Sequence, residues 1–191
     1  MDQNIIIIKN YAAYLERLKK YLGEDTAAKL VETLGGDDKV MNATFYNMEK
    51  SGLAYNGSLV VAIFDVIRFA LGINALLPED RQAKQESIIK VGLLQHIAKV
   101  NMFEDSEAWQ KKNGTIYKYA QQRGALRCGE RSTFIASEIG IHFTVDEFEA
   151  MKSIDKDTVV DDYAIYYSTT LSTIMRQANE LVSLKHRTAT C

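Results

Sequence analysis

Two adjacent polar residues, Gln95 and His96, interrupt an apolar helical run, ESIIKVGLLQHIAKVNMF, at residues 86–103. A histidine in such a place can serve as a general base or as a metal ligand. Cys128 could supply a thiolate nucleophile, so Cys–His catalysis by Cys128 and His96 is one hypothesis. The simpler interpretation is a hydrogen-bonded core histidine and a small structural cysteine, because no base lies near Cys128 in sequence.

Three cationic side chains near these positions are candidates for binding an anion: Lys99, Arg127 and Arg131. Charge-assisted hydrogen bonds from lysine and arginine can hold a phosphate or a nucleotide without a metal ion. The alternative is that these side chains are solvated or pair with nearby acids such as Glu130.

Composition limits the classes of protein to which the chain can belong. Its 191 residues are 47% hydrophobic and 25% charged with a net charge of −2, which is typical of one ordinary globular domain. Nucleic acid is not indicated as a partner, since no excess of basic residues is present. Cys128 and Cys191 predict neither a disulfide framework nor a zinc site, so a reducing, cytoplasmic location is expected.

No segment predicts export or a membrane span. The start, MDQNIIIIKN, lacks the basic region and longer apolar core of a signal peptide. The run SLVVAIFDVIRFALG is short and contains Asp65 and Arg68, so it is expected to be a core helix. The four isoleucines 5–8 are expected to add a strand to a partner or to anchor one through apolar contact.

Helical spacing dominates the first half of the chain, and the predicted class is all-α. Residues 10–23 and 25–36 predict a helical hairpin, with Asp25 as the N-cap of its second helix. A buried helix is expected to follow, with Ser58 as N-cap and Gly72 just past its end. After Pro78 a helix is expected to run to about residue 100.

The second half predicts shorter elements. Asn113 and Gly114 between alternating runs predict a small hairpin within an irregular excursion at 101–128. A short helix is expected to end at Gly140, and Thr144 with Glu147 forms a capping box at the start of the next one. A long helix over 158–184 is expected to pack one face on the core: Ala164, Tyr167, Leu171, Ile174, Ala178 and Leu181. Tyr163, Tyr166 and Tyr167 are expected to pack in a core or interface rather than to stack on bases.

Five stretches occur in an order that matches a known family: YNGSLVVA, ESIIKVGLLQHIAKV, RCGERS, FTVDEFEAMKSI and RQANELV. The chain resembles the HD-domain metal-dependent phosphohydrolases, in particular the compact type of Bacteroides-like bacteria and their phages. The resemblance covers residues 43–184. It implies a compact HD-like helical bundle of one domain, residues 1–191, with a helical N-terminal extension at 1–40 and a tail at 185–191.

The resemblance also implies that the positions of the family's metal ligands have changed. Those positions hold Ala62, Gln95, His96, Cys128 and Asn179 in this sequence, and a further ligand histidine of the family falls near Ile154. A divalent ion that activates water needs imidazole and carboxylate ligands, whereas this set offers neutral carbonyls and no carboxylate. We therefore expect no metal, no cofactor and no catalytic residues.

These observations favour a catalytically inactive HD-like domain that acts as a structural or protein-interaction component, for example of a phage or bacterial assembly. Its expected partners are other protein chains, in a homo- or hetero-oligomer, and its location would be the bacterial cytoplasm or a virion. One alternative is a nucleotide or phosphate-ligand binding module that uses the former HD pocket. Another is an active phosphohydrolase with a rebuilt site.

Overall fold

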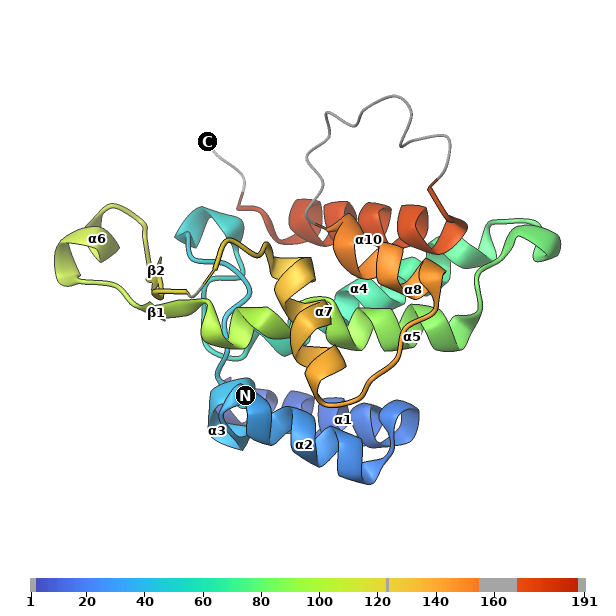
Figure 1. Cartoon of the computed structure of the whole chain (residues 1–191). Helices are drawn as coiled ribbons and strands as arrows, with labels where there is room; N and C mark the ends of the chain where they lie inside the picture. Colours follow the sequence, from blue (N-terminus) through green and yellow to red (C-terminus); the bar gives the residue numbers. More distant parts are fainter. Residues whose placement is uncertain (1–2, 123, 155–167, 189–191) are drawn as a thin grey trace.

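The structure, a computed structural model, describes residues 3–122, 124–154 and 168–188. Helices dominate this part of the chain and stack in layers, with α1–α3 at one end, α4 and α5 in the middle and α8 and α10 on the other side (Figure 1). The α-helices are α1 Gln3–Leu22, α2 Glu24–Leu34, α3 Asp37–Met41, α4 Ser58–Ala75, α5 Gln85–Leu94, α6 Ala108–Lys112, α7 Cys128–Glu138, α8 Val145–Ser153 and α10 Thr170–His186. The predicted class, an all-α compact bundle, is confirmed.

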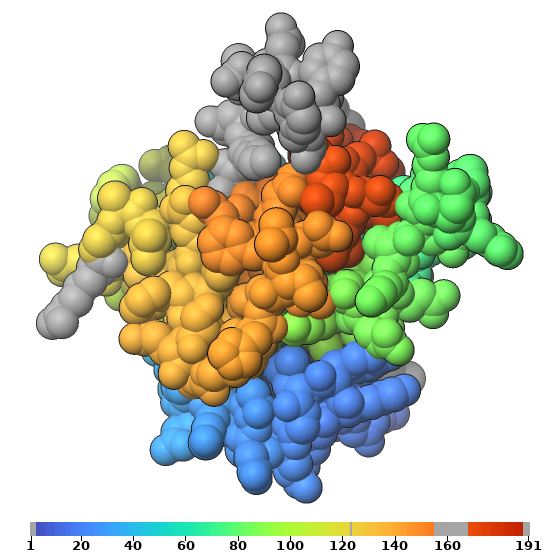
Figure 2. Space-filling model, turned by 45° about the vertical axis from the view of Figure 1, so that its right-hand side comes forward, coloured from blue at the N-terminus to red at the C-terminus, as the bar shows by residue number. Residues whose placement is uncertain are grey.

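The N-terminal hairpin of α1 and α2 forms as predicted, and it belongs to the common core. Tyr14 is buried on α1 and its hydroxyl donates to the carbonyl oxygen of Leu93 on α5 at 3.1 Å. The hairpin occupies one end of the molecular surface (Figure 2). Two details differ from the prediction. The isoleucines 5–8 lie inside α1, so the added-strand interpretation is wrong, and the N-cap of α2 is Gly23 rather than Asp25.

Helix α4 is the central core helix, and it is longer than predicted. It continues past Gly72 to Ala75, and its N-cap is Gly57. The hydroxyl of Ser58, the first helical residue, instead accepts from the Phe45 amide at 2.9 Å and donates to the Leu53 carbonyl at 2.7 Å. By length and composition α4 could cross a bilayer, but more than half of it is buried in the bundle. The buried core helices of soluble proteins can have the same length and apolar composition.

A buried carboxylate joins α4 to the end of α10. Asp65 accepts from Lys185 and lies 2.7 Å from Nε2 of His186, while Arg68 bridges its other oxygen at 2.9 Å. Burial alone would raise the pKa of Asp65, but the hydrogen bonds from Lys185 and His186 outweigh that effect and hold this pKa below its ordinary value of 3.8. Asp65 therefore stabilises the folded chain fully above that ordinary pKa, and this contribution is lost as the pH falls below it.

Replacing this carboxylate is expected to weaken the attachment of α10. Asp65→Asn should lower the free energy of unfolding at pH 7 by about 2 kcal/mol, since charge-assisted hydrogen bonds are lost while cations remain beside the site. Denaturant unfolding measures the change. Asp80→Asn, at an exposed position between α4 and α5, is the matched control and should be close to neutral. Equal effects of the two substitutions would contradict the role given to Asp65.

The predicted helix through residue 100 is interrupted after Leu94. Gln95 caps α5, His96 adopts φ −112° and ψ 5°, and the chain resumes as a 3₁₀ turn, η3, over Ile97–Asn101. The amide of Ala98 donates to the hydroxyl of Ser132 on α7 at 3.0 Å instead of continuing the α-helical ladder. A hydrogen bond from a distant helix is not visible in local sequence, which explains why the prediction of one continuous helix was wrong.

The smaller elements follow the predictions closely. An antiparallel hairpin pairs β1 Phe103–Asp105 with β2 Tyr117–Tyr119, and α6 lies between the strands. Gly114 supplies a positive φ of 79° in the turn before β2. Helix α7 ends two residues before Gly140, and the capping box of α8 joins Thr144 Oγ1 to the Glu147 amide at 3.2 Å.

The C-terminal helix is described from Thr170 to His186; residues 155–167, with the tyrosine cluster, lie outside the described residues. Three of its predicted core positions, Leu171, Ile174 and Ala178, are buried as expected. Leu181 is 38% exposed, however, and Val182 is buried in its place. The buried stripe drifts by one residue because a straight α-helix turns slightly less than the 3.5-residue repeat requires.

Candidate functional site

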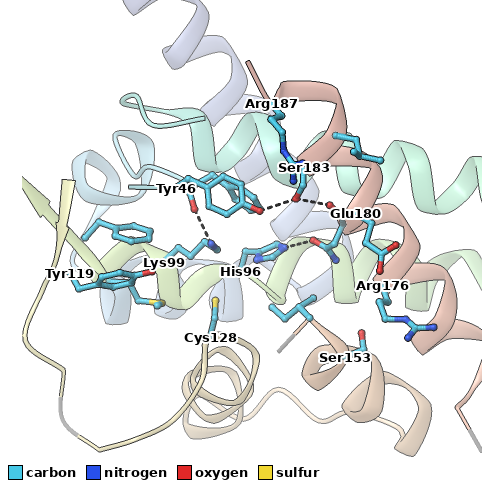
Figure 3. Close-up of a pocket in the computed structure, with 16 residues that line it drawn as sticks. Tyr46, His96, Lys99, Tyr119, Cys128, Ser153, Arg176, Glu180, Ser183 and Arg187 are labelled. Atoms are coloured by element: carbon cyan, nitrogen blue, oxygen red, sulfur yellow. Dashed lines mark hydrogen bonds between the residues drawn. The ribbon is translucent and has the colours of Figure 1, made fainter. Parts of the chain in front are cut away.

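A cavity of about 680 Å³ opens where α10, η3, the β-hairpin and the start of α7 meet (Figure 3). Its size is in the range of small-molecule pockets, about 300–1,000 Å³. The lining side chains come from segments distant in sequence: Phe45, Tyr46, His96, Lys99, Met102, Phe103, Tyr119, Cys128, Ser153, Ile154, Arg176, Asn179, Glu180, Ser183, Leu184 and Arg187. The cavity is therefore a product of the tertiary fold.

Helix α10 supplies one wall through polar residues at helical spacing. Arg176, Asn179, Glu180, Ser183 and Arg187 follow one another at steps of three, one, three and four, which places them along one face. The opposite face of α10 carries its buried apolar stripe. Packing of that stripe on α4 and α8 therefore turns the polar face toward the cavity.

Three amide and imidazole groups form a chain of hydrogen bonds at the base of the cavity. The amide nitrogen of Asn179 donates to the Met175 carbonyl at 2.8 Å and to Gln95 Oε1 at 3.4 Å. This orientation aims Asn179 Oδ1 at His96, whose Nε2 lies 2.7 Å away. Because Oδ1 only accepts, His96 carries its proton on Nε2 in the neutral form. Gln95 and Asn179, two of the changed family positions, are therefore joined by a long hydrogen bond.

The environment of His96 keeps its ring neutral. Burial, together with the nearby charge of Lys99, lowers the pKa of His96 from 6.5 to about 3, and the hydrogen bond to Asn179 offsets only part of this effect. The ring of Phe45 packs edge-on against the imidazole at 4.7 Å between centroids. The unprotonated Nδ1 has no hydrogen-bond partner among the described residues. This acceptor is buried beneath the lining of the cavity.

Lys99 brings a positive charge to the cavity in a fixed position. Its ammonium donates to the Phe45 carbonyl oxygen at 2.8 Å and lies over the rings of Phe45, Tyr46 and Phe103 at 4.3, 4.8 and 5.8 Å. Cation–π contacts of this kind hold a charge while leaving it electrostatically effective. The hydroxyl of Tyr46 lies 2.8 Å from the hydroxyl of Ser183 on α10, so this hydrogen bond links the wall that contains Tyr46 to the wall formed by α10 (Figure 3).

The structure brings several of the predicted site residues together. His96, Cys128 and Asn179 line the cavity, as does Ile154. Ala62 and Gln95 are fully buried and do not line it.

The predicted cationic contacts are only partly correct. Lys99 lines the cavity, but Arg127 and Arg131 do not. Arg127 is the N-cap of α7, where its amide donates to Glu130 at 3.2 Å, and Arg131 donates to the Gly124 carbonyl at 3.3 Å. Nearness to Cys128 in sequence therefore does not bring either guanidinium group to the lining of the cavity.

Sequence analysis missed two cationic residues of the cavity, Arg176 and Arg187. A signal was available in the stretch RQANELV, because Arg176 lies three residues before Asn179 and therefore shares its helical face. Arg187 had no comparable signal, since it caps α10 in a stretch expected to be a tail. Together with Lys99, and counting only the described residues that line the cavity, this makes three cations against one carboxylate, Glu180, in a chain whose net charge is −2.

The donor atoms in and around the cavity do not make a metal centre. No three His, Cys, Asp or Glu side chains are grouped so as to hold a metal ion within residues 3–122, 124–154 and 168–188. His96 is the imidazole at this site, but Asn179 and Gln95 add only neutral amides beside it, and the positive charge of Lys99 lies near enough to lower the pKa of His96. The arrangement suits an anion better than a cation.

Comparisons with known proteins give limited information. No family model matches the chain, and no solved structure is significantly similar to it. The chain is similar to the ATP-dependent 6-phosphofructokinases of Actinobacillus pleuropneumoniae serotypes 5b, 3 and 7, each 28% identical over 151 residues. The match covers 79% of this chain and 46% of each relative, so the chain spans just under half the length of the curated relatives it matches.

Proposed function

We propose that this chain is a non-catalytic, HD-like domain that binds a small phosphorylated ligand, without metal, in the cavity between η3 and α10. The observation that carries this proposal is the grouping of Lys99, Arg176 and Arg187 around a cavity large enough for a nucleotide. Arginine and lysine recognise phosphate through charge-assisted hydrogen bonds and need no metal for it.

The neutral side chains of the cavity indicate what else the ligand carries. The neutral imidazole of His96 adds an uncharged surface to the cavity lining, while its Nδ1 is buried. Tyr46, Phe103 and Tyr119 give an aromatic wall on which a flat ring can pack. A phosphate group joined to a sugar or a base has these complementary features.

The degenerate ligand positions support the non-catalytic part of the proposal. The five family positions supply an alanine, two amides, a thiol and one neutral imidazole. Water activation for phosphoester hydrolysis would need a bound ion or a strong base, and the pKa of His96, lowered to about 3, makes that imidazole a weak base.

Ligand binding can be tested by calorimetry with inorganic phosphate, ATP and a sugar phosphate, with and without EDTA. ATP belongs in the panel because the curated relatives are named as ATP-dependent kinases of a sugar phosphate. Arg176→Ala and Arg187→Ala should each weaken binding about 10-fold or more, since each removes a charge-assisted contact. Arg131→Ala removes the same charge outside the cavity and should leave affinity unchanged.

Three results would count against this proposal. They are no binding by any ligand of the panel, binding that Arg176→Ala and Arg187→Ala leave intact, or binding that disappears with EDTA. Turnover of a phosphorylated ligand that His96→Ala abolishes would favour the rebuilt phosphohydrolase instead.

A second candidate, the protein-interaction role, is supported by apolar side chains left exposed on the first turns of α1. Ile5 and Ile8 are 46% and 57% exposed there, whereas Tyr11, Tyr14 and Leu18 farther along the helix are buried in the core. The interpretation of the isoleucines as an apolar anchor is consistent with this exposure.

A further inference from the structure

Helix α1 carries an exposed stripe with the spacing of a coiled-coil seam. Ile5, Ile8, Ala12, Leu15 and Lys19 follow one another at steps of three and four. The first three side chains and Lys19 are exposed, and Leu15 is half-buried at the edge of the core. The neighbouring face of α1, about a quarter turn away, carries Tyr11, Tyr14 and Leu18 and is buried in the bundle. The stripe is therefore a second apolar face that the folded chain leaves uncovered.

The stripe borders a shallow groove between α1 and α2. The groove has a volume of about 500 Å³ and small or apolar residues on its floor, including Ala27, Ala28 and Val31. Leu15 and Lys19 of the stripe form its α1 wall. A second helix laid along the stripe would therefore contact α2 as well as α1, which increases the apolar area covered.

The charges beside the stripe identify the occupant. Lys9 and Glu16 are both exposed on the same flank of α1, and neither forms an ion pair within the part of the chain that the structure describes. They lie seven residues apart, about two turns, which is too far for them to meet on one helix. Their midpoint falls beside Ala12, the centre of the stripe.

We infer that α1 pairs with α1 of a second copy of this chain in an antiparallel, two-fold arrangement centred on Ala12. In that arrangement Lys9 faces the partner's Glu16, and Glu16 faces the partner's Lys9. The two-fold axis therefore gives two equivalent ion pairs in each dimer. Ile8 packs against the partner's Leu15, and Ile5 packs along the alkyl chain of the partner's Lys19. Ala12, the smallest side chain of the stripe, lets the two helices approach at the axis.

The inference deepens the protein-interaction candidate and does not depend on the cavity. Sedimentation equilibrium of the 191-residue chain over a range of concentrations should show a reversible dimer of twice the 21.5 kDa chain mass. Ile8→Glu should abolish the dimer, because it places a charge in the seam. Ile6→Glu changes an isoleucine that is 40% exposed on another face of α1 and should leave the dimer intact.

Charge reversals give the sharper test, because they predict a rescue. Lys9→Glu alone opposes two carboxylates at each contact and Glu16→Lys alone opposes two ammonium groups, so each should weaken dimerisation about 10-fold or more. An equimolar mixture of the two variants should restore it, since every contact is again between opposite charges. The double variant Lys9→Glu with Glu16→Lys should also dimerise, and Lys112→Glu on α6 should change nothing.

A monomeric wild-type chain at every concentration would overturn the inference, as would a dimer that both single reversals leave unchanged or a mixture that fails to recover. Ligand affinity measured on the same variants should equal that of the wild type. A wild-type chain that stays monomeric but binds ligand would refute the α1 pairing alone, and a wild-type chain that dimerises but binds no ligand would refute the proposed ligand site alone.

Discussion

Acidification from pH 7 to pH 5 is expected to lower the free energy of unfolding of this chain by about 2 kcal/mol through His96 alone. The pKa of His96 is 6.5 in an unfolded chain and about 3 in the folded one. Between these values the unfolded chain binds a proton that the folded chain does not, so stability falls by about 1.4 kcal/mol for each pH unit below 6.5. The contribution is complete above pH 6.5 and is lost as the pH falls toward 3.

Urea unfolding at pH 7, 6 and 5 measures this effect, with His96→Gln as the comparison. The variant keeps a side chain able to bond Asn179 but does not titrate, so its stability should depend less on pH, by the same 2 kcal/mol. Proton NMR gives a second readout if the variant folds poorly. The chain has three histidines, and the resonance missing from the variant identifies His96. A His96 resonance that titrates near pH 6.5 would refute the buried neutral state.

Gly52→Ala is expected to destabilise the chain by about 3 kcal/mol or more, which is the largest effect expected of a single methyl group here. Gly52 has φ +69°, where a side chain is strained by roughly 1–2 kcal/mol. A Cβ at this position would also lie 1.8 Å from the backbone carbonyl oxygen of His186, at the end of α10. A backbone atom cannot move aside as a flexible side chain can, so α10 would have to shift.

Gly114→Ala separates the two causes. Gly114 has a similar φ of +79°, but a Cβ there would meet no atom within 4 Å, so that variant pays only for the strained backbone. The free energies of unfolding of the two variants, measured with denaturant, should therefore differ by the free energy of the clash. Because Ser183, Leu184 and Arg187 at the end of α10 line the cavity, Gly52→Ala should weaken ligand binding as well. Equal destabilisation by the two substitutions would contradict this account.

Local sequence patterns predicted the helices and the Thr144 cap well because their causes are local, whereas the N-caps expected at Asp25 and Ser58 are in fact Gly23 and Gly57. The Thr144–Glu147 capping box, the turn at Gly114 and the hairpin of α1 and α2 each depend on residues a few positions apart. The break after Leu94 was not predictable in this way, since it depends on a hydrogen bond that the Ala98 amide donates to the hydroxyl of Ser132, 34 residues farther along the chain.

The candidate site was predicted in part for the same reason. The family resemblance indicated His96, Cys128 and Asn179, which the fold does bring to one cavity. It could not indicate Arg187, whose place depends on the length of α10, or exclude Arg131, whose direction depends on how α7 packs. A sequence pattern can indicate which positions correspond to the site of a family. The direction of a long charged side chain at such a position is decided by tertiary packing.

The fixed position of the Lys99 ammonium reduces the conformational entropy that is lost when a ligand binds in the cavity. A free lysine side chain loses about 2 kcal/mol of conformational entropy when it is fixed in one geometry. The Phe45 carbonyl and three aromatic rings already fix the Lys99 ammonium in the absence of ligand. That entropy is therefore lost during folding rather than on binding, and an anion meets a charge that is already in place.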